Sequence, residues 1–296
     1  MASHPAISII PPYANAAGIS KDDITSMFQE IELVSKKYHQ YSQDPKFLTF
    51  LKRSSFSYVF TANKLEGTCP ARISESDTFR ILANFDASGD PPTTRFPADG
   101  RSSDPEEARV QMIRHHLALQ HLFDVKTLDV SSLLRVHELM LTGAVEENGD
   151  AVLAGQFREV DVFAGRHQFP GVNRVQLQDG TELSSIEHTT QKICADFENA
   201  VAENHSFLKI ATDLFFNMIQ LHPFTNGNGR LCRMLLAYAL KRCDILPYPI
   251  QLSSSHSKSK KHYLSAILSR QNNGKTDYLY FLVLQSVHAA SRNLDS

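Results

Sequence analysis

The pattern of apolar and polar positions along this chain predicts a succession of helices. In the stretch before residue 222, Leu214, Met218 and Leu221 recur three and four positions apart, which places them on one face of a helix. The same kind of pattern, or a pair of end signals, predicts helices over residues 22–41, 46–67, 74–85, 104–125, 130–143, 185–204, 207–222, 229–243, 259–271 and 276–293.

One segment has a different period. Between residues 154 and 177, Val160 and Val162 alternate with polar neighbours and Gly165 follows them, which predicts a short β-hairpin. No internal repeat interrupts the series. The expected fold is therefore mainly α, with one small β element.

Composition shifts divide the chain into regions. Residues 1–18 are expected to form a flexible tail, and residues 19–104 a helical region that contains a long helix at about 45–67. A stretch rich in Gly, Pro, Ser and Asp at about 86–104 is typical of a linker. The remaining core is expected over residues 105–290.

The overall composition narrows the class of partner. The 296 residues are 42% hydrophobic and 21% charged, with a formal net charge of -2, so strong attraction to nucleic acid or to an anionic membrane is not expected. The first residues lack the basic and apolar segments of a signal peptide, and no apolar run approaches the ~20 residues of a membrane-spanning helix. We therefore expect a soluble protein of the cytoplasm, or of the nucleus, that binds neither nucleic acid nor membrane.

Several familiar chemical motifs are missing from the sequence. The stretch RVHELML at 135–141 has no second histidine four positions on, so a zinc protease is not indicated, and no P-loop lysine follows the glycines near residue 227. The basic run SKSKK at 257–261 is expected to be a solvated face. No C-x-x-C pair occurs among the four cysteines, which suit a reducing compartment; they are Cys69, Cys194, Cys232 and Cys243.

The stretch HPFTNGNGRLCR, residues 222–233, gathers side chains that carry chemistry. One helix ends before it and another begins near Gly229, so it is a helix–loop–helix junction. Gly227 and Gly229 let a ligand approach the backbone closely, and the free N–H groups of a helix start attract anions. Arg230 and Arg233 lie three positions apart on one helix face, where they can bind phosphate or carboxylate oxygens.

Each of these features alone is most often structural. A histidine before a proline, such as His222, is commonly a capping or packing residue, and a glycine–asparagine loop is commonly only a turn. Their conjunction within twelve residues favours a functional site.

These twelve residues resemble the signature of the Fic family, H-P-F-x-[D/E]-G-N-G-R-x-x-R, and eleven of the twelve positions are compatible with it. Upstream, LLRVHELMLTG…AGQFREVDVFAG is similar to the family's helix and flap hairpin, and downstream CDILPYPIQLSSSHSKSKKHYLSAIL is similar to the segment after the motif helix. The resemblance covers about residues 105 to 285. It implies a Fic-type helical bundle with a small β-hairpin flap.

Fic proteins typically transfer AMP from ATP to a protein hydroxyl. For this chain the resemblance implies His222 as the general base for a Ser, Thr or Tyr hydroxyl, a role that suits an imidazole. The backbone from Gly227 to Gly229 and the amide of Asn228 would hold the α- and β-phosphates. The two arginines of the motif, Arg230 and Arg233, would neutralise the leaving pyrophosphate.

The resemblance also implies a place for the target protein. The flap would pin the backbone of the target by strand addition, and its residues here are Val162, Phe163, Ala164 and Gly165. Tyr263 would line the adenine pocket, although an aromatic residue on a helix is more often part of the core. The implied partners are ATP and a protein with a hydroxyl side chain.

Asn226 is the one departure from the signature. The family usually has Asp or Glu there, and that carboxylate binds Mg²⁺; an amide oxygen is a neutral and weaker ligand. Three outcomes stay open: an enzyme that uses Mg²⁺ or Mn²⁺ through weaker binding, an enzyme with another metal or another nucleotide, and a protein that binds nucleotide without transfer.

A second site is implied far upstream. The stretch TANKLEGT, residues 61–68, resembles the inhibitory helix of the family, [S/T]-x-x-x-E-[G/N], through Glu66 and Gly67. Ala62 lacks the usual hydroxyl, which predicts a helix that docks differently or less firmly. The expected role of Glu66 is to pair with Arg233 and misplace the triphosphate, and the alternative is a solvated glutamate before a glycine cap.

Two classes of function follow. The first is an autoinhibited transferase that modifies protein hydroxyls, with or without the reverse reaction. The second is a catalytically weak protein that binds nucleotide for an interaction. A homodimer is compatible with both.

Overall fold

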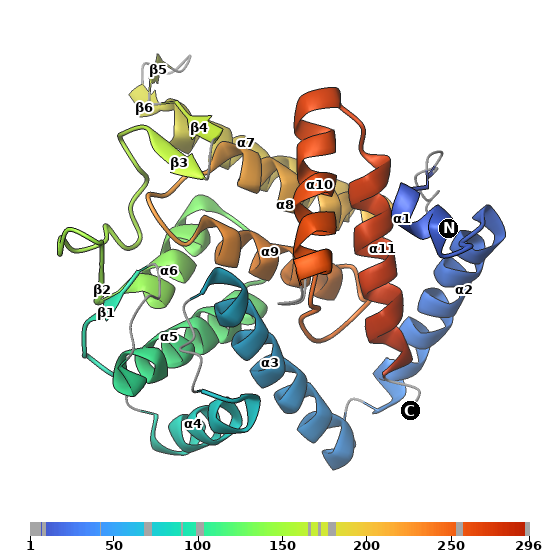
Figure 1. The fold of residues 1–296 in the computed structure, drawn as a ribbon, viewed down its shortest axis with the longest axis horizontal. Coiled ribbons are helices and arrows are strands. Elements are labelled where there is room, and N and C mark those ends of the chain that lie inside the picture. The colour runs from blue at the N-terminus through green and yellow to red at the C-terminus, as the bar shows by residue number, and fades with distance from the viewer. Residues whose placement is uncertain are drawn as a thin grey trace.

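The described part of the chain folds mainly into helices, as expected (Figure 1). The structure is a computed structural model, and it describes residues 7, 10–41, 43–67, 73–89, 91–98, 104–164, 167–170, 173–176, 182–252 and 257–293. The helices are α1 (Pro12–Ala16), α2 (Lys21–Tyr38), the 3₁₀ turn η1 (His39–Tyr41), α3 (Pro45–Glu66), α4 (Glu75–Ser88), α5 (Pro105–Asp124), α6 (Val130–Leu141), α7 (Ser185–Ala202), α8 (Phe207–Leu221), α9 (Asn228–Arg242), α10 (Ser257–Asn273) and α11 (Asp277–Arg292).

Strands form three short pairs among these residues. The predicted hairpin is present as β3 (Val162–Ala164) and β4 (His167–Phe169), which are antiparallel. Two further pairs were not predicted, and each of their strands has only two or three residues. They are the parallel pair β1 (Phe96–Pro97) and β2 (Ala144–Val145), and the antiparallel pair β5 (Arg174–Gln176) and β6 (Glu182–Ser184).

Several helix ends follow directly from local chemistry. Ser74 and Asp77 form a capping box at the start of α4, which satisfies backbone N–H groups that the helix leaves free. Asp104 accepts a hydrogen bond from the backbone of Glu106, with a proline at the first position of α5. Gly67 ends α3 with a φ of 74°, a left-handed conformation that glycine adopts at little cost.

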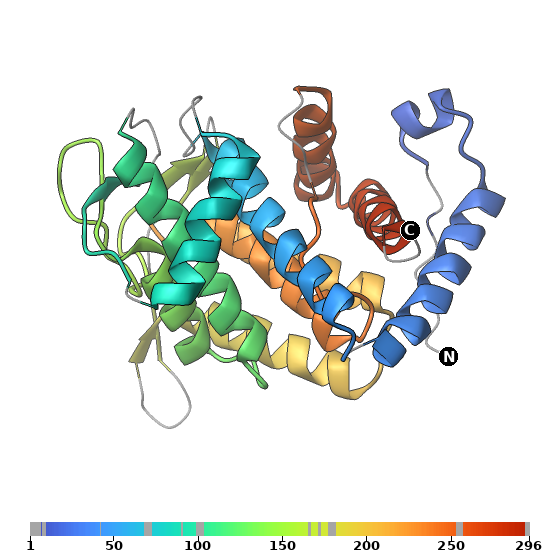
Figure 2. The same ribbon diagram turned by 90° about the horizontal axis from the view of Figure 1, so that it is seen from below.

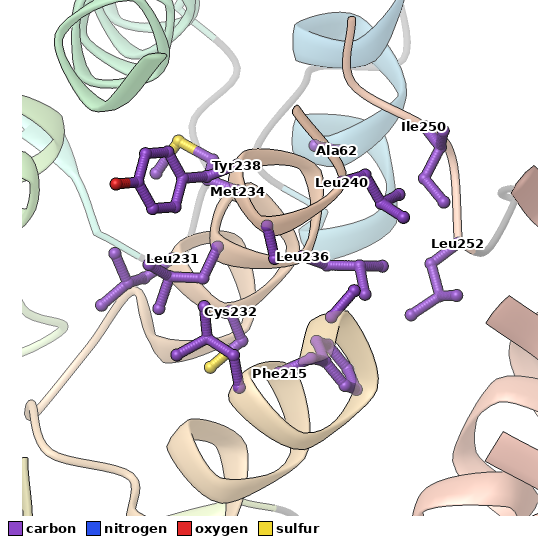
Figure 3. Close-up of a cluster of buried hydrophobic side chains, with 14 of the residues drawn as sticks. Ala62, Phe215, Leu231, Cys232, Met234, Leu236, Tyr238, Leu240, Ile250 and Leu252 are labelled. Atoms are coloured by element: carbon purple, nitrogen blue, oxygen red, sulfur yellow. The ribbon is translucent and has the colours of Figure 1, made fainter. Parts of the chain in front are cut away.

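Helix α9 lies at the centre of the core. Figure 3 shows its side chains packed against Phe215 of α8, against Ile250 and Leu252 of the segment that follows α9, and beside Ala62 of α3. Fully burying one leucine or methionine stabilises a fold by ~1.5–3 kcal/mol, and α9 has apolar buried residues around its whole circumference. They are Leu231, Cys232, Met234, Leu235, Leu236, Ala237, Tyr238, Ala239 and Leu240. The loop before α9 is therefore anchored to a rigid element.

Helix α3 lies beside α4 and α5 and also contacts α9 (Figure 2). In the second half of α3, Phe56, Val59 and Leu65 are buried, whereas Leu48 near its start is exposed. The carboxyl end of α3 thus reaches the start of α9, although the two are far apart in the sequence.

Two of the expected boundaries change. Residues 10–18 are structured rather than a tail, because α1 forms there with Ala14 buried, and Tyr13 stacks on His262 with 3.9 Å between ring centroids. The expected linker begins later, after α4, and Phe96 within it is 1% exposed. In the described residues, no helix combines the length and apolarity needed to span a bilayer.

Candidate active site

His222 lies at the point where α8 ends. It follows the last helical residue with a φ of 51°, in the left-handed region that few non-glycine residues occupy. The following proline disfavours the helical conformation for His222, so the local sequence itself turns the chain. Its backbone N–H still donates to the carbonyl of Met218 at 3.0 Å, which closes the helix.

The imidazole of His222 is held in one orientation. Nδ1 lies 3.1 Å from the carbonyl oxygen of Ile219, and since a carbonyl only accepts, Nδ1 carries the proton. Phe169 of β4 stacks on the ring, with 4.0 Å between centroids and 13° between planes. Nε2 is therefore left with a lone pair, which is the form that a general base requires.

The surroundings of His222 keep its imidazole neutral. Burial lowers its pKa most, the Ile219 carbonyl raises it, and the positive charge of Arg158 lowers it further. The pKa of His222 lies below its ordinary value as the sum of these effects. A neutral imidazole near pH 7 can accept a proton.

The loop after His222 is shaped by its glycine and asparagines. Gly227 has a φ of 75°, and a Cβ there would lie 2.8 Å from side-chain atoms of both Met140 and Leu141. Asn226 Oδ1 accepts from the backbone N–H of Gly227 at 2.7 Å. Asn228 accepts from the N–H of Phe224 at 3.1 Å and donates to its carbonyl at 2.8 Å.

These contacts give the Asn228 amide a structural role. Both its oxygen and its nitrogen brace the loop, and its contact with a phosphate stays a prediction. What Asn228 offers to an anion is its backbone N–H at the start of α9, where a helix leaves donors unpaired.

His137 of α6 supports this loop, a role that no signal in the sequence indicated. Its Nδ1 accepts from the N–H of Gly155 at 2.9 Å, so Nε2 carries the proton and donates to the carbonyl of Asn226 at 3.1 Å. The ring stacks on Phe224 with 3.7 Å between centroids. Burial lowers the pKa of His137 to about 4, against a rise from its hydrogen bond to Asn226.

The two arginines of the motif face one cavity, as their spacing predicted. Arg230 is 3% exposed and donates to the carbonyl of Ala98 at 3.2 Å. Arg233 forms an ion pair with Glu66 from the end of α3. Burial lowers the pKa of the Arg233 guanidinium, and the negative charge of Glu66 outweighs burial and raises it.

The carboxylate of Glu66 lies at the start of α9. A Cβ on Gly229 would lie only 2.7 Å from Glu66 Oε1 and 3.3 Å from Arg233, so the absence of a side chain at Gly229 makes room for the ion pair. Burial alone would raise the pKa of Glu66, but Arg233 and then Arg230 lower it below its ordinary value. The Glu66 side chain keeps 35% of its surface exposed, because it lies on the wall of an open cavity.

The docking of α3 does not depend on the hydroxyl that Ala62 lacks. Ala62 is 3% exposed and packs against the core, while its two neighbours form the polar contacts. Gln251 donates to the hydroxyl of Thr61 at 2.9 Å, and the amide nitrogen of Asn63 lies 3.1 Å from Nδ1 of His115. The polar contacts of this part of α3 thus come from residues 61 and 63, and a docking that differs from that of the family stays a prediction.

A cavity of about 560 Å³ brings the predicted residues together. Its volume lies in the range typical of sites for small molecules and cofactors. It is lined by Leu65, Glu66, Gly67, Ala98, Phe163, Ile219, His222, Thr225, Asn226, Gly227, Asn228, Gly229, Arg230, Arg233, Lys260, Tyr263 and Leu264. Lys260 belongs to the basic run expected to be a solvated face; it is exposed, as expected, and it also lines this cavity.

Tyr263 lies at the arginine end of the cavity. It is 7% exposed, and burial raises the pKa of its hydroxyl to about 12, against the opposing effect of Arg233, to which it is hydrogen-bonded. Its contact with an adenine ring stays a prediction.

The flap contributes one side chain to the cavity wall. In the hairpin, Val162 pairs with Phe169, and Phe163 pairs with Gln168. Phe163 is 67% exposed and lines the cavity, whereas Val162 does not. Ala164 ends β3, and Gly165 lies outside the described residues.

The residues present do not form a divalent-metal site of their own. Among the described residues, no three His, Cys, Asp or Glu side chains cluster in a metal-binding arrangement. Asn226 lines the cavity, but its amide oxygen is neutral and already accepts from Gly227. Because Mg²⁺ prefers several oxygen ligands with carboxylates among them, this donor set does not fit a resident ion.

Comparisons with known proteins agree with the resemblance to the Fic family. Residues 127–240 match the model of the Fic/DOC family. A protein adenylyltransferase Fic from Culex quinquefasciatus is 27% identical over 173 residues, and one from Aedes aegypti is 26% identical over 173 residues. Each match covers 55% of this chain and 30% of the relative, so the chain corresponds to less than a third of the mosquito proteins. A Fido domain-containing protein from Dictyostelium discoideum is 27% identical over 145 residues, which cover 49% of this chain and 94% of that protein.

Solved structures share the fold over nearly the whole chain. Fic-1 (residues 134–508) from C. elegans has a TM-score of 0.65 at 17% identity and covers 95% of this chain and 74% of that one. A Fic family protein from Desulfovibrio desulfuricans G20 has a TM-score of 0.60 at 16% identity, with 98% and 76% covered. Residues 127–240 thus match the Fic/DOC family model, and the chain as a whole has a mainly helical fold like that of the solved Fic proteins.

Proposed function

We propose that this protein is an autoinhibited adenylyltransferase, which transfers AMP from ATP to a Ser, Thr or Tyr hydroxyl of a target protein. One observation carries the proposal. His222, whose Nε2 keeps a lone pair, lines the same cavity as the start of α9, Arg230 and Arg233. The names of the mosquito relatives, protein adenylyltransferase Fic, support the same activity.

In the proposed reaction, the chain supplies a base and an anion cradle. His222 Nε2 takes the proton of the target hydroxyl while its oxygen attacks the α-phosphorus of ATP, and the bond to the β-phosphate oxygen breaks. Pyrophosphate leaves with the negative charge, which Arg230 and Arg233 offset. Reactions of this kind depend mostly on positioning and charge stabilisation, so a rigid cradle supplies much of the catalysis.

Glu66 would keep this site at rest. Its carboxylate occupies the anion position beside Gly229 and pairs with Arg233, where the terminal phosphates of ATP would otherwise bind. Two anions repel each other at such a short separation, so ATP would bind out of register or displace α3. Glu66 would therefore inhibit by occupying the position that the terminal phosphates of ATP need.

The hydroxyl would enter past the flap. Phe163 on β3 and Leu264 on α10 both line the cavity, and both are exposed, by 67% and 46%. A target chain that adds to β3 as a strand would lay its side chains across these two apolar groups. We expect the target to carry an apolar residue near the modified hydroxyl.

Divalent metal would enter with the nucleotide. Mg²⁺ or Mn²⁺ bound to the triphosphate brings most of its own ligands, and Asn226 would add at most one neutral oxygen. The same observation supports the alternative function, a protein that binds nucleotide and transfers nothing, or that uses another nucleotide. The proposal includes a second activity of the same site, the removal of AMP from a modified target.

Labelled nucleotides distinguish these functions. The Glu66→Gly variant is incubated with Mg²⁺ and ATP labelled at the α- or the γ-phosphate, alone and with cell extract. We expect α-label on protein, no γ-label, and no label when His222→Ala is added. Nucleotide binding without α-label would support the binder, and γ-label would indicate a kinase-like reaction and contradict the proposal.

A further inference from the structure

Arg158 is a buried guanidinium that the reaction does not use directly. It lies in the loop between β2 and β3 and is 3% exposed. Burying a charge costs free energy unless polar partners surround it. The partners of Arg158 therefore indicate what it does.

These partners come from three separate places. Arg158 Nε donates to the carbonyl of His222 at 2.7 Å. One terminal nitrogen donates to the carbonyls of Val160 at 2.7 Å and Pro170 at 2.9 Å. Its backbone N–H also donates to the carbonyl of Pro223 at 3.0 Å.

The positions of these carbonyls are informative. Val160 precedes β3 and Pro170 follows β4, so the two stems of the flap hairpin meet at one guanidinium. That group also holds the carbonyl of His222, whose left-handed backbone conformation needs outside support. Phe169, next to Pro170, stacks on the imidazole of His222.

We propose that Arg158 is a positioning residue that couples the flap hairpin to His222, so that the target strand and the base are placed as one unit. The planar fork of arginine can bind several carbonyls in a fixed geometry, which the single ammonium of lysine cannot reproduce. This structural role of Arg158 does not depend on the proposed transferase activity. Only the expected loss of transfer rate in Arg158 variants rests on that activity.

The positive charge of Arg158 acts on the imidazole as well. The charged and titratable groups that act on His222 are Arg158, His167 of β4 and Glu66 of α3. Arg158 and His167 lower the pKa of His222, and Glu66 raises it, while burial has the largest lowering effect. Removing the charge of Arg158 should therefore raise the pKa of His222.

Two substitutions separate geometry from charge. Arg158→Met removes both the fork and the charge, whereas Arg158→Lys removes the fork and keeps the charge. Arg114→Met is the matched control, because Arg114 is a buried guanidinium on α5 that donates to the carbonyl of Pro92 at 2.8 Å and does not line the cavity. All three carry Glu66→Gly, so that transfer is measured without the competing carboxylate.

The first measurement needs no activity. The imidazole of His222 is titrated by NMR, its signal assigned by its loss in His222→Gln, and amide exchange of residues 162–164 and 167–169 is followed in the same samples. We expect the titration midpoint to rise in Arg158→Met and to move less in Arg158→Lys. Exchange in the hairpin should increase in both variants and stay unchanged in Arg114→Met.

The second measurement is the rate of transfer to a target. Both Arg158 variants should lose about 10²-fold in kcat/KM, as expected when a reacting group is misplaced by about 1 Å, and Arg114→Met should lose little. An unchanged midpoint and hairpin in a folded Arg158→Met variant would overturn the proposal, as would equal losses in Arg114→Met. If Arg158→Met does not fold, Arg158→Lys decides by hairpin exchange and rate. If no variant transfers AMP, the proposed function fails, while the titration and exchange data still decide the role of Arg158.

Discussion

The carboxylate of Glu66 on α3 pairs with the guanidinium of Arg233 on α9, and it does so at the place where α9 begins. A side chain on Gly229 would collide with that carboxylate, since its Cβ would lie 2.7 Å from Oε1. The start of a helix attracts anions through its free N–H groups and its dipole. Glu66 thus occupies a position suited to a phosphate oxygen. The proposed inhibition and the proposed catalysis therefore use the same part of the cavity.

Replacing Glu66 should activate the protein. Hydrogen bonds to charged groups contribute about 1.5–3 kcal/mol, so releasing Arg233 in Glu66→Gly should raise AMP transfer by about tenfold to a hundredfold. The measurement is incorporation of α-labelled ATP into protein. Lys64→Gly controls for loosening of the helix, because Lys64 is exposed in the same turn of α3. Equal activation in that control, or none in Glu66→Gly, would contradict the account.

Asn226 offers a test of the metal requirement. An aspartate at this position keeps the oxygen that accepts from Gly227 and adds a negative charge toward the cavity. In the Glu66→Gly background, Asn226→Asp should lower the Mg²⁺ concentration that gives half-maximal transfer by several-fold, because Mg²⁺ prefers carboxylates. The measurement is a Mg²⁺ titration at fixed ATP. An unchanged midpoint would mean that position 226 does not contact the metal.

Exposed apolar residues at the cavity mouth offer a test of target docking. Leu264→Ser should raise the KM for a protein target by about tenfold and leave ATP affinity unchanged, since losing a buried leucine contact costs at least ~1.5 kcal/mol. Leu33→Ser is the matched control, because Leu33 is also exposed, on α2. If Leu264→Ser lowers the affinity for ATP as well as for the target, Leu264 contacts the nucleotide and the account of target docking is wrong.

The buried His137 predicts a pH dependence of stability. Its pKa is about 4 in the folded protein and ~6.5 when unfolded, so between these values the unfolded chain binds more protons. Stability should therefore fall as the pH drops from about 6.5 toward 4, by roughly 3 kcal/mol from this residue. His137→Gln should be less stable at pH 8 but lose less on acidification, as measured by urea unfolding.

The pH dependence of the His137→Gln variant decides whether His137 carries this effect. If the free energy of unfolding of His137→Gln depends on pH as in the parent protein, His137 is protonated equally in the folded and unfolded states.

The sequence predicted the residues that carry local signals. The loop from His222 to Arg233 has glycines, a proline and paired charges within a short span, and local chemistry decides its conformation. The pairing of Glu66 with Arg233 was implied by resemblance alone, because nothing local brings residues 167 positions apart together.

The supporting residues could not be predicted in this way. His137 and Arg158 lie in segments that read as an ordinary helix and hairpin, and their roles depend on carbonyls presented by distant parts of the fold. The brace formed by the Asn228 amide was missed for the same reason. A buried histidine or arginine has no periodic signature, so only the packed structure shows which groups it satisfies.

A crystal structure of the Glu66→Gly variant with a non-hydrolysable ATP analogue tests the central claim most directly. We predict that the phosphates lie at the start of α9 beside Gly229 and Arg233, with the α-phosphorus facing Nε2 of His222. Phosphates bound elsewhere in the molecule, or an imidazole turned away from the α-phosphorus, would contradict the account.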